Sequence, residues 1–324
     1  MNFLPVPPPI ATPSTRLPVR DGVSASCLVL PSSRRPLWPS LLDALAERLP
    51  SVSRADWQQR LDAGQVCNAW GQPLAAHSPT HSGQRVYYWR HVPDEPELPF
   101  TYQVLYQDRH LLVVDKPHWV PVTPAGRYAR SSLLARLKRE LGLPELSPIH
   151  RIDRETAGLV AFALRPQDRD AYQALFRERV VHKVYEAVAP SPPPERSWPV
   201  LRHTRLAEDE QAFFRMHEVP GPPDSETRVQ WLRHVPGTAL SLYRLEPITG
   251  KRHQLRVHMA GLGLPIANDV FYPSVTRGPD QPDDYPHPLQ LLARRLAFVD
   301  PITGVPHRFS SQLQLAMAQH QPPH

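Results

Sequence analysis

The side chains with the clearest capacity for chemistry lie in residues 150–158, which run His-Arg-Ile-Asp-Arg-Glu-Thr-Ala-Gly. Asp153 stands between two arginines, and the apolar run at residues 159–162 predicts a buried strand after it. A guanidinium beside a carboxylate favours the ionised form and lowers its pKa. We therefore interpret Asp153 as an ionised nucleophile or base at the end of a strand. The alternative is a structural Asp–Arg pair in a loop.

Two later segments carry basic and aromatic side chains in regular patterns. Lys183 and Tyr185 are two positions apart in a predicted strand, so both should face the same side. Thr249 can cap a helix, and Arg252 and Arg256, four positions apart, should then be neighbours on one helix face. Each pattern alone is also typical of a solvent-exposed strand or helix.

Together and in this order, the three segments resemble the signature motifs of the RluA-type pseudouridine synthase family. Those motifs are His-Arg-Leu-Asp-Arg-x-Thr-Ser-Gly, Lys-x-Tyr and Thr-Gly-Arg-x-His-Gln-Ile-Arg-Val-His. Residues 115–117 (Asp-Lys-Pro) and 265–269 (Pro-Ile-Ala-Asn-Asp) resemble two further family segments, and the likeness extends over residues 99–309. Within the three motifs the chain differs at four positions, none of them catalytic in the family: Ile152, Ala157, Lys251 and Leu255.

The resemblance implies a role for each matching residue. Asp153 matches the catalytic aspartate, which attacks the ribose C1′ or takes a proton from C2′. Arg256 matches the arginine that pairs with this aspartate, and Tyr185 matches the tyrosine on which the target uracil stacks. Arg151 matches an arginine that helps to extrude the base. The further substrate-binding residues implied in this way are Lys183, Leu255, His150, Arg154 and Arg252.

The implied activity is the isomerisation of uridine in structured RNA, with ribosomal RNA as the first expectation and transfer RNA as the second. Uracil moves from an N1 to a C5 linkage, so the glycosidic bond must break while the base is retained. Neither step transfers electrons or needs an activated water, and we therefore expect no cofactor and no metal. The alternatives are a base-excising glycosylase, which would release free uracil, and a non-catalytic RNA-binding relative.

The elements that must position these residues predict an α+β fold with a mixed, mostly antiparallel sheet and flanking helices. A hairpin is predicted around residues 107–110, and Ser131 or Ser132 can cap a helix at residues 133–141. Pro166 suits the first turn of a further helix. Other strands are predicted at residues 158–164, 180–189, 227–232 and 239–245. A polar, proline-rich insertion separates the second of these strands from the third.

The first part of the chain predicts a separate small α/β module at residues 22–92. It holds two short helical patterns, the second beginning at Ser53 and ending near Gly64, and then strand-like segments. This module resembles, in degenerate form, the αL-type RNA-binding module, although its near-neutral charge also fits a structural appendage. The full expected division is a flexible tail at 1–21, the module at 22–92, a linker at 93–99 and the catalytic domain at 100–324.

Composition narrows the classes of partner and compartment. The formal net charge is +6, and all but one unit of it lies after residue 97, which favours an acidic partner such as RNA. Cys27 and Cys67 are the only cysteines, as is typical of a reducing cytoplasm. The sequence shows no signal peptide and no apolar run of about 20 residues, so no membrane segment is expected. His253 and His258 lack the spacing of metal ligands. We expect a cytoplasmic monomer without an obligate protein partner.

Overall fold

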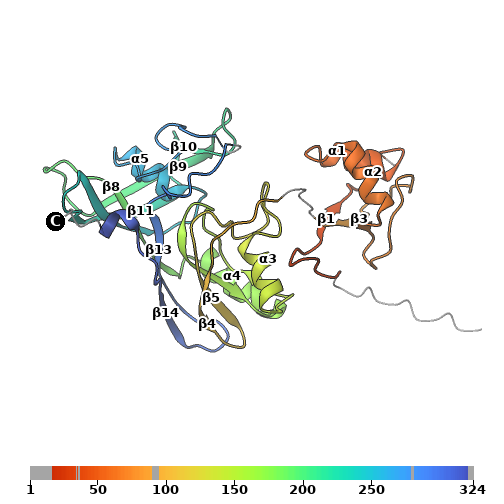
Figure 1. Ribbon diagram of the computed structural model, residues 1–324, viewed down its shortest axis with the longest axis horizontal. Coiled ribbons are helices and arrows are strands. Elements are labelled where there is room, and N and C mark those ends of the chain that lie inside the picture. Colours follow the sequence, from red (N-terminus) through yellow and green to blue (C-terminus); the bar gives the residue numbers. More distant parts are fainter. Residues whose placement is uncertain (1–16, 34, 36, 90–94, 279–280, 320–324) are drawn as a thin grey trace, which may run out of the picture. The chain divides into compact units, whose positions relative to one another are not determined.

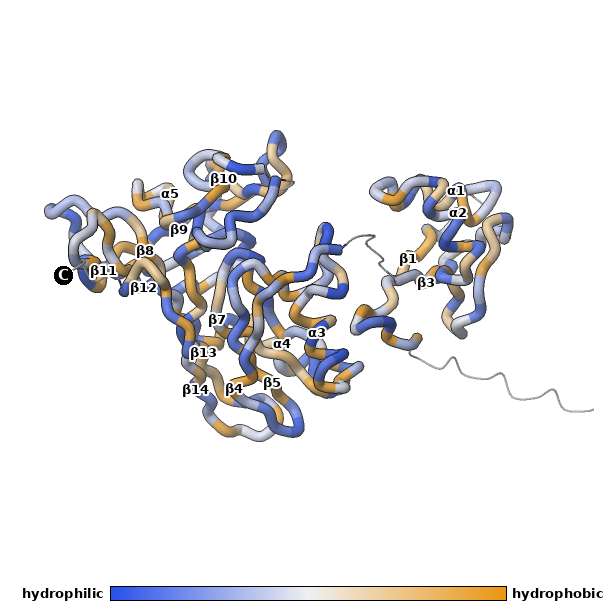
Figure 2. The backbone as a smooth tube through the Cα atoms, viewed as in Figure 1, coloured by the Kyte–Doolittle hydropathy of each residue, from blue (hydrophilic) through white to orange (hydrophobic). Residues whose placement is uncertain are grey.

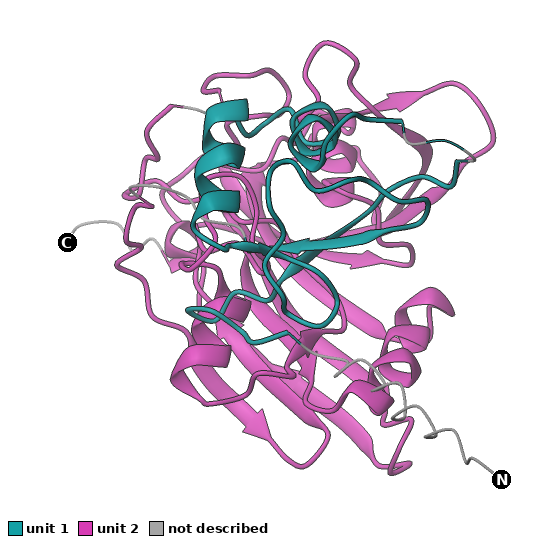
Figure 3. Ribbon diagram, turned by 90° about the vertical axis from the view of Figure 1, so that its right-hand side faces the viewer, with its two compact units in different colours: residues 1–94 teal, residues 95–324 magenta. Residues whose placement is uncertain are grey.

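The computed structural model divides the chain into two compact units, which we call unit 1 (residues 1–94) and unit 2 (residues 95–324) (Figures 1 and 3). Among the residues that the structure describes, no helix is long and apolar enough to cross a membrane. The described residues are 17–33, 35, 37–89, 95–278 and 281–319.

Unit 1 packs two short helices against a small antiparallel sheet with the strand order β1-β3-β2. The second helix begins where the sequence predicts, because the Oγ of Ser53 accepts the backbone N–H of Asp56 at 3.1 Å. Its core joins leucines of α1 to Trp57, which is fully buried. The elements are β1 (Ser26–Val29), α1 (Leu41–Arg48), α2 (Arg54–Asp62), β2 (Val66–Cys67) and β3 (Arg85–Tyr88).

Unit 2 is built on one mixed, mostly antiparallel sheet, which confirms the predicted α+β fold. Along the main path of its described strands the order is β10-β9-β11-β12-β8-β13-β7-β5-β4, with β14 beside β13 and β6 beside β7. The strands are β4 (Gln103–Gln107), β5 (Leu111–Lys116), β6 (Ser147–Pro148), β7 (Ala157–Ala163), β8 (His182–Pro190), β9 (Val200–Glu208), β10 (Met216–Val219), β11 (Ser225–His234), β12 (Leu240–Pro247), β13 (Leu291–Val299) and β14 (Pro306–Ser310).

The strands β5 and β7 are buried along their whole length, because helices and strands cover both of their faces. Successive side chains of a strand point to opposite faces. The even-numbered apolar residues of both strands accordingly pack against α3 (Leu133–Glu140). The odd-numbered ones other than Ala157 pack against Tyr172 of α4 (Arg169–Arg177) and against Phe298. Figure 2 shows these strands as a largely hydrophobic centre.

The other half of the sheet carries the helix α5 (Gln254–Gly261), whose Leu255 and Met259 pack on β8, β11 and β12. Here the sequence prediction was incomplete. The polar insertion expected before residue 227 contains two strands, β9 and β10, which pair antiparallel. The exposed residues of β9 are mostly polar: His203, Arg205 and Glu208, with Leu201 as the exception. Such a strand lacks the apolar run by which the buried strands are recognised.

The two halves of the sheet meet through a very short parallel pairing, which we call the β7–β13 seam. Only two residue pairs form it: Leu292 with Ala157, and Ala293 with Gly158. The φ angle of Gly158 is +109°, and a Cβ built there would lie 2.4 Å from the carbonyl oxygen of Ala293. Glycine is therefore required at this point of closest approach, directly after the loop that carries Asp153.

The division after Asp94 falls inside the segment expected to be a linker, residues 93–99, and the residues from Glu95 onward contact unit 2. The Glu95 carboxylate is buried and accepts the backbone N–H groups of Ala129, Arg130 and Ser131 at 2.6–2.9 Å. These three residues precede α3, so Glu95 anchors the start of unit 2. Within unit 1, the indole N–H of Trp89 donates to the carbonyl of Pro18. Pro18 lies within the expected tail.

Candidate active site

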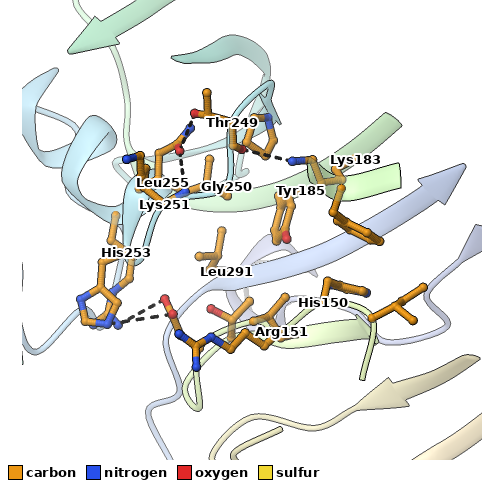
Figure 4. Close-up of a pocket in the computed structure, with 18 residues that line it drawn as sticks. His150, Arg151, Lys183, Tyr185, Thr249, Gly250, Lys251, His253, Leu255 and Leu291 are labelled. Carbon is orange, nitrogen blue, oxygen red and sulfur yellow. Dashed lines mark hydrogen bonds and ion pairs between the residues drawn. The ribbon is translucent and has the colours of Figure 1, made fainter. Parts of the chain in front are cut away.

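A cavity of about 310 Å³ opens between the loop before β7, the strand β8 and the turn before α5. Figure 4 shows side chains from all three segments pointing into it. Most of the predicted site residues are brought together here, although they come from three distant parts of the sequence. Those that line the cavity are His150, Arg151, Asp153, Lys183, Tyr185, Leu255 and Arg256.

Asp153 lies in this cavity with 24% of its side chain exposed. Its Oδ2 is 3.8 Å from Nη1 of Arg256, and its Oδ1 is 4.0 Å from Nε2 of His253. Burial raises the pKa of Asp153 above its usual value, and the nearby Asp269 raises it too, although Arg256 opposes both. The predicted lowering of this pKa was therefore wrong.

The reason is that burial has the largest effect on this pKa, and that Arg154, one of the two arginines flanking Asp153 in the sequence, is bound elsewhere. Arg154 forms two hydrogen bonds with Asp283, at 2.8 and 2.7 Å, and a third with Glu155. It does not line the cavity, so the substrate-binding role predicted for it has no support from its placement. Arg151 lines the cavity but is exposed to solvent, which weakens its influence on the carboxylate.

Arg256 is the buried cation of the site, with 1% of its side chain exposed. Its closest partner is Asp269, which it contacts through Nε at 2.8 Å and Nη2 at 2.6 Å. Glu155 lies 3.5 Å from Nη1, closer than Asp153 does. Burial alone would lower the pKa of Arg256, but these carboxylates raise it above its usual value. The pairing with Asp153 implied by the family motifs is thus a longer contact within a larger cluster of charges.

The predicted helix around Arg256 begins later than expected. His253 is the residue that precedes α5, so Arg252 lies outside the helix and does not share a face with Arg256. Arg252 instead contacts Glu208 and the carbonyl of Phe213, and it does not line the cavity.

Thr249 is also not the helix cap that the sequence suggested. Its hydroxyl donates to the Oε1 of Gln254 at 2.7 Å and accepts the backbone N–H of Glu226 at 2.9 Å. These bonds fix the turn before α5 against the start of β11, so the helix begins only after that turn.

The strand β8 supplies Lys183 and Tyr185, which lie on the same side of the cavity as predicted (Figure 4). The ammonium group of Lys183 donates to the carbonyl of Thr249 at 3.1 Å, and burial, with Arg179 nearby, lowers its pKa to about 8. Burial and the neighbouring Asp153 raise the pKa of Tyr185, so its hydroxyl stays protonated at neutral pH. The Tyr185 ring gives the cavity a flat, partly apolar wall.

His150 holds the loop rather than offering a charge to the cavity. Its Nε2 accepts the backbone N–H of Ala161 at 3.1 Å, and its ring stacks on Phe176 with centroids 4.7 Å apart. Burial lowers the pKa of His150 to about 3, so the imidazole is neutral. A neutral histidine with one ring nitrogen committed to β7 ties the loop to the strand that follows it.

Two residues near Asp153 were not among those predicted. Lys116 is fully buried, and its ammonium group donates to the carbonyls of Pro117, Val120 and Arg154 at 2.8–3.1 Å. Burial lowers the pKa of Lys116 to about 7. Its signal in the sequence was the Asp-Lys-Pro segment. His253 was visible only as part of the last motif.

Among the described residues, no group of His, Cys, Asp and Glu side chains could hold a metal ion.

Comparison with known proteins places this site in a family. Residues 110–261 match the family model described as RNA pseudouridylate synthase. An uncharacterised RNA pseudouridine synthase of Synechocystis is 30% identical over 72% of this chain and 79% of its own length. The dual-specificity RNA pseudouridine synthase RluA of Vibrio parahaemolyticus is 32% identical over 64% of this chain and 80% of its own length.

A solved structure supports the same fold. The human RNA pseudouridylate synthase domain containing 1 superposes with a TM-score of 0.53 over 71% of this chain and all of its own, at 23% identity. The resemblance stated from the motifs is confirmed for the region around Asp153, whereas the module before residue 93 lies outside the family match. The chain therefore belongs to the RNA pseudouridylate synthase family.

Proposed function

We propose that this chain isomerises uridine in structured RNA and that Asp153 is the group that acts on the sugar. The observation that carries the proposal is the position of the Asp153 carboxylate inside the cavity. Arg256 and His253 lie 3.8 and 4.0 Å from it, and Tyr185 lines the same cavity, close enough for Asp153 to raise its pKa. This is an arrangement for one nucleotide, with an aromatic wall for a base and an anion for the sugar.

The cavity volume of about 310 Å³ suits a single extruded nucleotide rather than a duplex. A base inside a helix is out of reach, so the target uridine must be flipped out of its stack. Its uracil would then lie against the Tyr185 ring, since stacking on an aromatic face retains a planar base without fixing its rotation. Arg151, at the exposed edge of the cavity, would contact the RNA backbone as the base enters.

The reaction breaks the bond between uracil N1 and ribose C1′ and forms one between C5 and C1′. C5 loses its proton and N1 gains one, so the product is an isomer of the substrate. Positive charge develops at the sugar as the first bond breaks. Asp153 either bonds to C1′ or removes a proton from C2′ to give an unsaturated sugar, and both routes need an ionised carboxylate. Burial disfavours the ionised form of Asp153, and Arg256 favours it. A poorly solvated anion stabilises the nearby positive charge strongly, because little water screens it.

The same geometry argues against base excision. A glycosylase must deliver water to C1′ and release the base. Here the uracil would remain between Tyr185 and the sugar, so it could turn and present C5. This proposal therefore expects pseudouridine in the RNA and no free uracil.

The RNA substrate is proposed from the relatives. RluA of Vibrio parahaemolyticus is named as dual-specificity, and a yeast relative is named as a mitochondrial tRNA pseudouridine(32) synthase. We propose a ribosomal or transfer RNA substrate here, with unit 1 adding contacts to that RNA. We also propose that the chain acts in the cytoplasm as a monomer, without a cofactor or an obligate protein partner.

The test is a map of pseudouridine in total RNA from cells with and without this protein. It is followed by reaction of the purified protein with the RNA identified. We expect a small number of uridines to lose the modification and the purified protein to restore it. Release of free uracil in place of pseudouridine would establish the glycosylase, and binding without either product would establish a non-catalytic RNA-binding protein.

A further inference from the structure

His253 occupies a constrained position at the edge of the cavity, immediately before α5 (Figure 4). Its φ angle is +52°, a left-handed conformation that is unusual for a residue other than glycine. Its ring stacks on Phe271, with centroids 6.1 Å apart, and meets Tyr272 edge-on at 5.8 Å. Only 9% of the side chain is exposed. The ring is therefore held in one orientation.

The hydrogen bonds of this ring favour one position for its proton. The backbone N–H of Met216 donates to the hydroxyl oxygen of Tyr272 at 2.7 Å. The Tyr272 proton is then available for Nδ1 of His253, which lies 3.0 Å away. Burial, with Arg256 nearby, lowers the pKa of His253 to about 3, so the ring is neutral and has a single N–H. We assign Nδ1 as the acceptor of the Tyr272 hydroxyl, because the oxygen of that hydroxyl already accepts the N–H of Met216. The single N–H of His253 is then on Nε2, 4.0 Å from Asp153.

The distance from this nitrogen to Asp153 is informative. Nε2 of His253 and Oδ1 of Asp153 are 4.0 Å apart, which is too far for a direct hydrogen bond. One oxygen atom placed at about 2.8 Å from both would see them at an angle of roughly 90°. It would accept the N–H of His253 and donate a proton to the carboxylate. A hydroxyl group can do both, whereas a carbonyl or ether oxygen has no proton to donate.

We propose that His253 and Asp153 together bind the 2′-hydroxyl of the target ribose, so that His253 is a specificity-determining residue for RNA over DNA. The inference rests on the proposed function, in which Asp153 acts at C1′ or C2′. The 2′-hydroxyl is the ribose hydroxyl nearest those carbons. Its contact with His253 also orients the sugar toward the carboxylate. Tyr272 is a positioning residue, because it acts only by setting the proton of His253.

The test compares two enzymes on two RNAs. The parent protein and His253→Leu each receive an RNA that carries either ribose or 2′-deoxyribose at the target uridine only. The kcat/KM for pseudouridine formation is measured for all four pairs. For each enzyme, the kcat/KM with ribose is divided by the kcat/KM with 2′-deoxyribose, and the two quotients are compared. The intrinsic effect of the hydroxyl on the sugar chemistry is common to both enzymes and cancels in this comparison. We expect the preference for ribose to be about tenfold smaller in His253→Leu than in the parent, the effect of one hydrogen bond.

Two further variants separate a specific contact from general damage. His253→Gln keeps an N–H donor and should retain part of the preference for ribose. Tyr272→Phe lacks the proton that fixes the ring, and it should lose part of that preference. The control His217→Leu changes an exposed histidine on β10 and should behave as the parent.

The outcomes distinguish this inference from the proposed function. If the parent forms no pseudouridine in any RNA, the proposed function fails. The second case is an active parent whose preference for ribose is the same as that of His253→Leu and of Tyr272→Phe. In that case His253 does not contact the hydroxyl. Should His253→Leu not fold, the Tyr272→Phe and His253→Gln ratios decide the question.

Discussion

Arg256 balances three carboxylates at once, and replacing it should separate its effect on stability from its effect on chemistry. In Arg256→Met, Asp269 is left with 0% of its side chain exposed and without its cation. Removing one partner of a buried ion pair costs about 3–5 kcal/mol of unfolding free energy. For a domain of this size each kcal/mol lowers the Tm by about 2–4 °C, so we expect a fall of roughly 6–20 °C.

The double variant Arg256→Met/Asp269→Asn should regain part of this stability, because the buried carboxylate without a partner is gone. An asparagine Oδ1 can still accept the backbone N–H groups of Phe271 and Tyr272, as Asp269 does at 2.9 and 3.2 Å. Activity should not return with stability. Without Arg256 the pKa of Asp153 rises further, so a smaller fraction is ionised at neutral pH.

Thermal unfolding and single-turnover formation of pseudouridine are measured on the same preparations. The control is Arg177→Met, which removes an exposed arginine paired with Asp170 at 2.9 Å and should change stability by less than about 1 kcal/mol. An unfolding temperature for Arg256→Met equal to that of the parent would show that Arg256 does not balance buried charge. Recovery of activity in the double variant would show that Arg256 acts on the chemistry only through Asp269.

Three further predictions follow from the charges of the site and from the anchor at Glu95. Asp153→Asn should abolish turnover and raise the Tm at neutral pH. Because the pKa of Asp153 is raised in the folded state, its ionisation begins to cost stability as the pH rises above the ordinary value of 3.8. The gain should vanish below that pH, where Asp153 is protonated in both the folded and the unfolded chain, and an unchanged Tm at neutral pH would contradict the prediction. Raising the pH through about 8 should remove the charge of Lys183 and raise the KM for RNA. A pH profile of kcat/KM should show this effect in the parent and not in Lys183→Met. A chain beginning at Glu95 should fold and keep its kcat, with a raised KM for RNA. A chain beginning at residue 98 should unfold at a lower temperature, because the backbone N–H groups of residues 129–131 lose their acceptor. Equal unfolding temperatures for the two truncated chains would refute the anchor.

The sequence predicted the parts of this fold that depend on local chemistry. The buried strand after Asp153 is a continuous apolar run, and the caps at Ser53 and Ser132 are properties of a few neighbouring residues. The three motifs identified seven of the side chains that line the cavity, although Arg154 and Arg252, predicted with them, do not line it. These features need no knowledge of which distant segments meet.

What sequence reasoning missed depends on distant contacts. The direction of the pKa shift of Asp153 was inferred from the arginines beside it in the chain. In the fold this pKa depends mainly on burial and on Arg256, about a hundred positions away. The ion pair of Arg154 with Asp283 joins residues far apart in the sequence, so no local pattern indicated it. The proton position on His253 depends on a strand, β10, that the sequence did not predict.

The β7–β13 seam has a consequence for how this protein can be divided. Asp153 belongs to the β7 side of the seam, whereas Tyr185 and Arg256 belong to the β8 and α5 side, where β13 pairs with β8 over six residue pairs rather than two. For its chemistry the molecule thus resembles a two-subunit enzyme whose active site lies at the subunit interface, except that a single chain supplies both subunits. A cut between α4 and β8 would give two pieces, each carrying half of the reactive set. Catalysis would return only when the pieces complement one another across a contact that tolerates no side chain at Gly158.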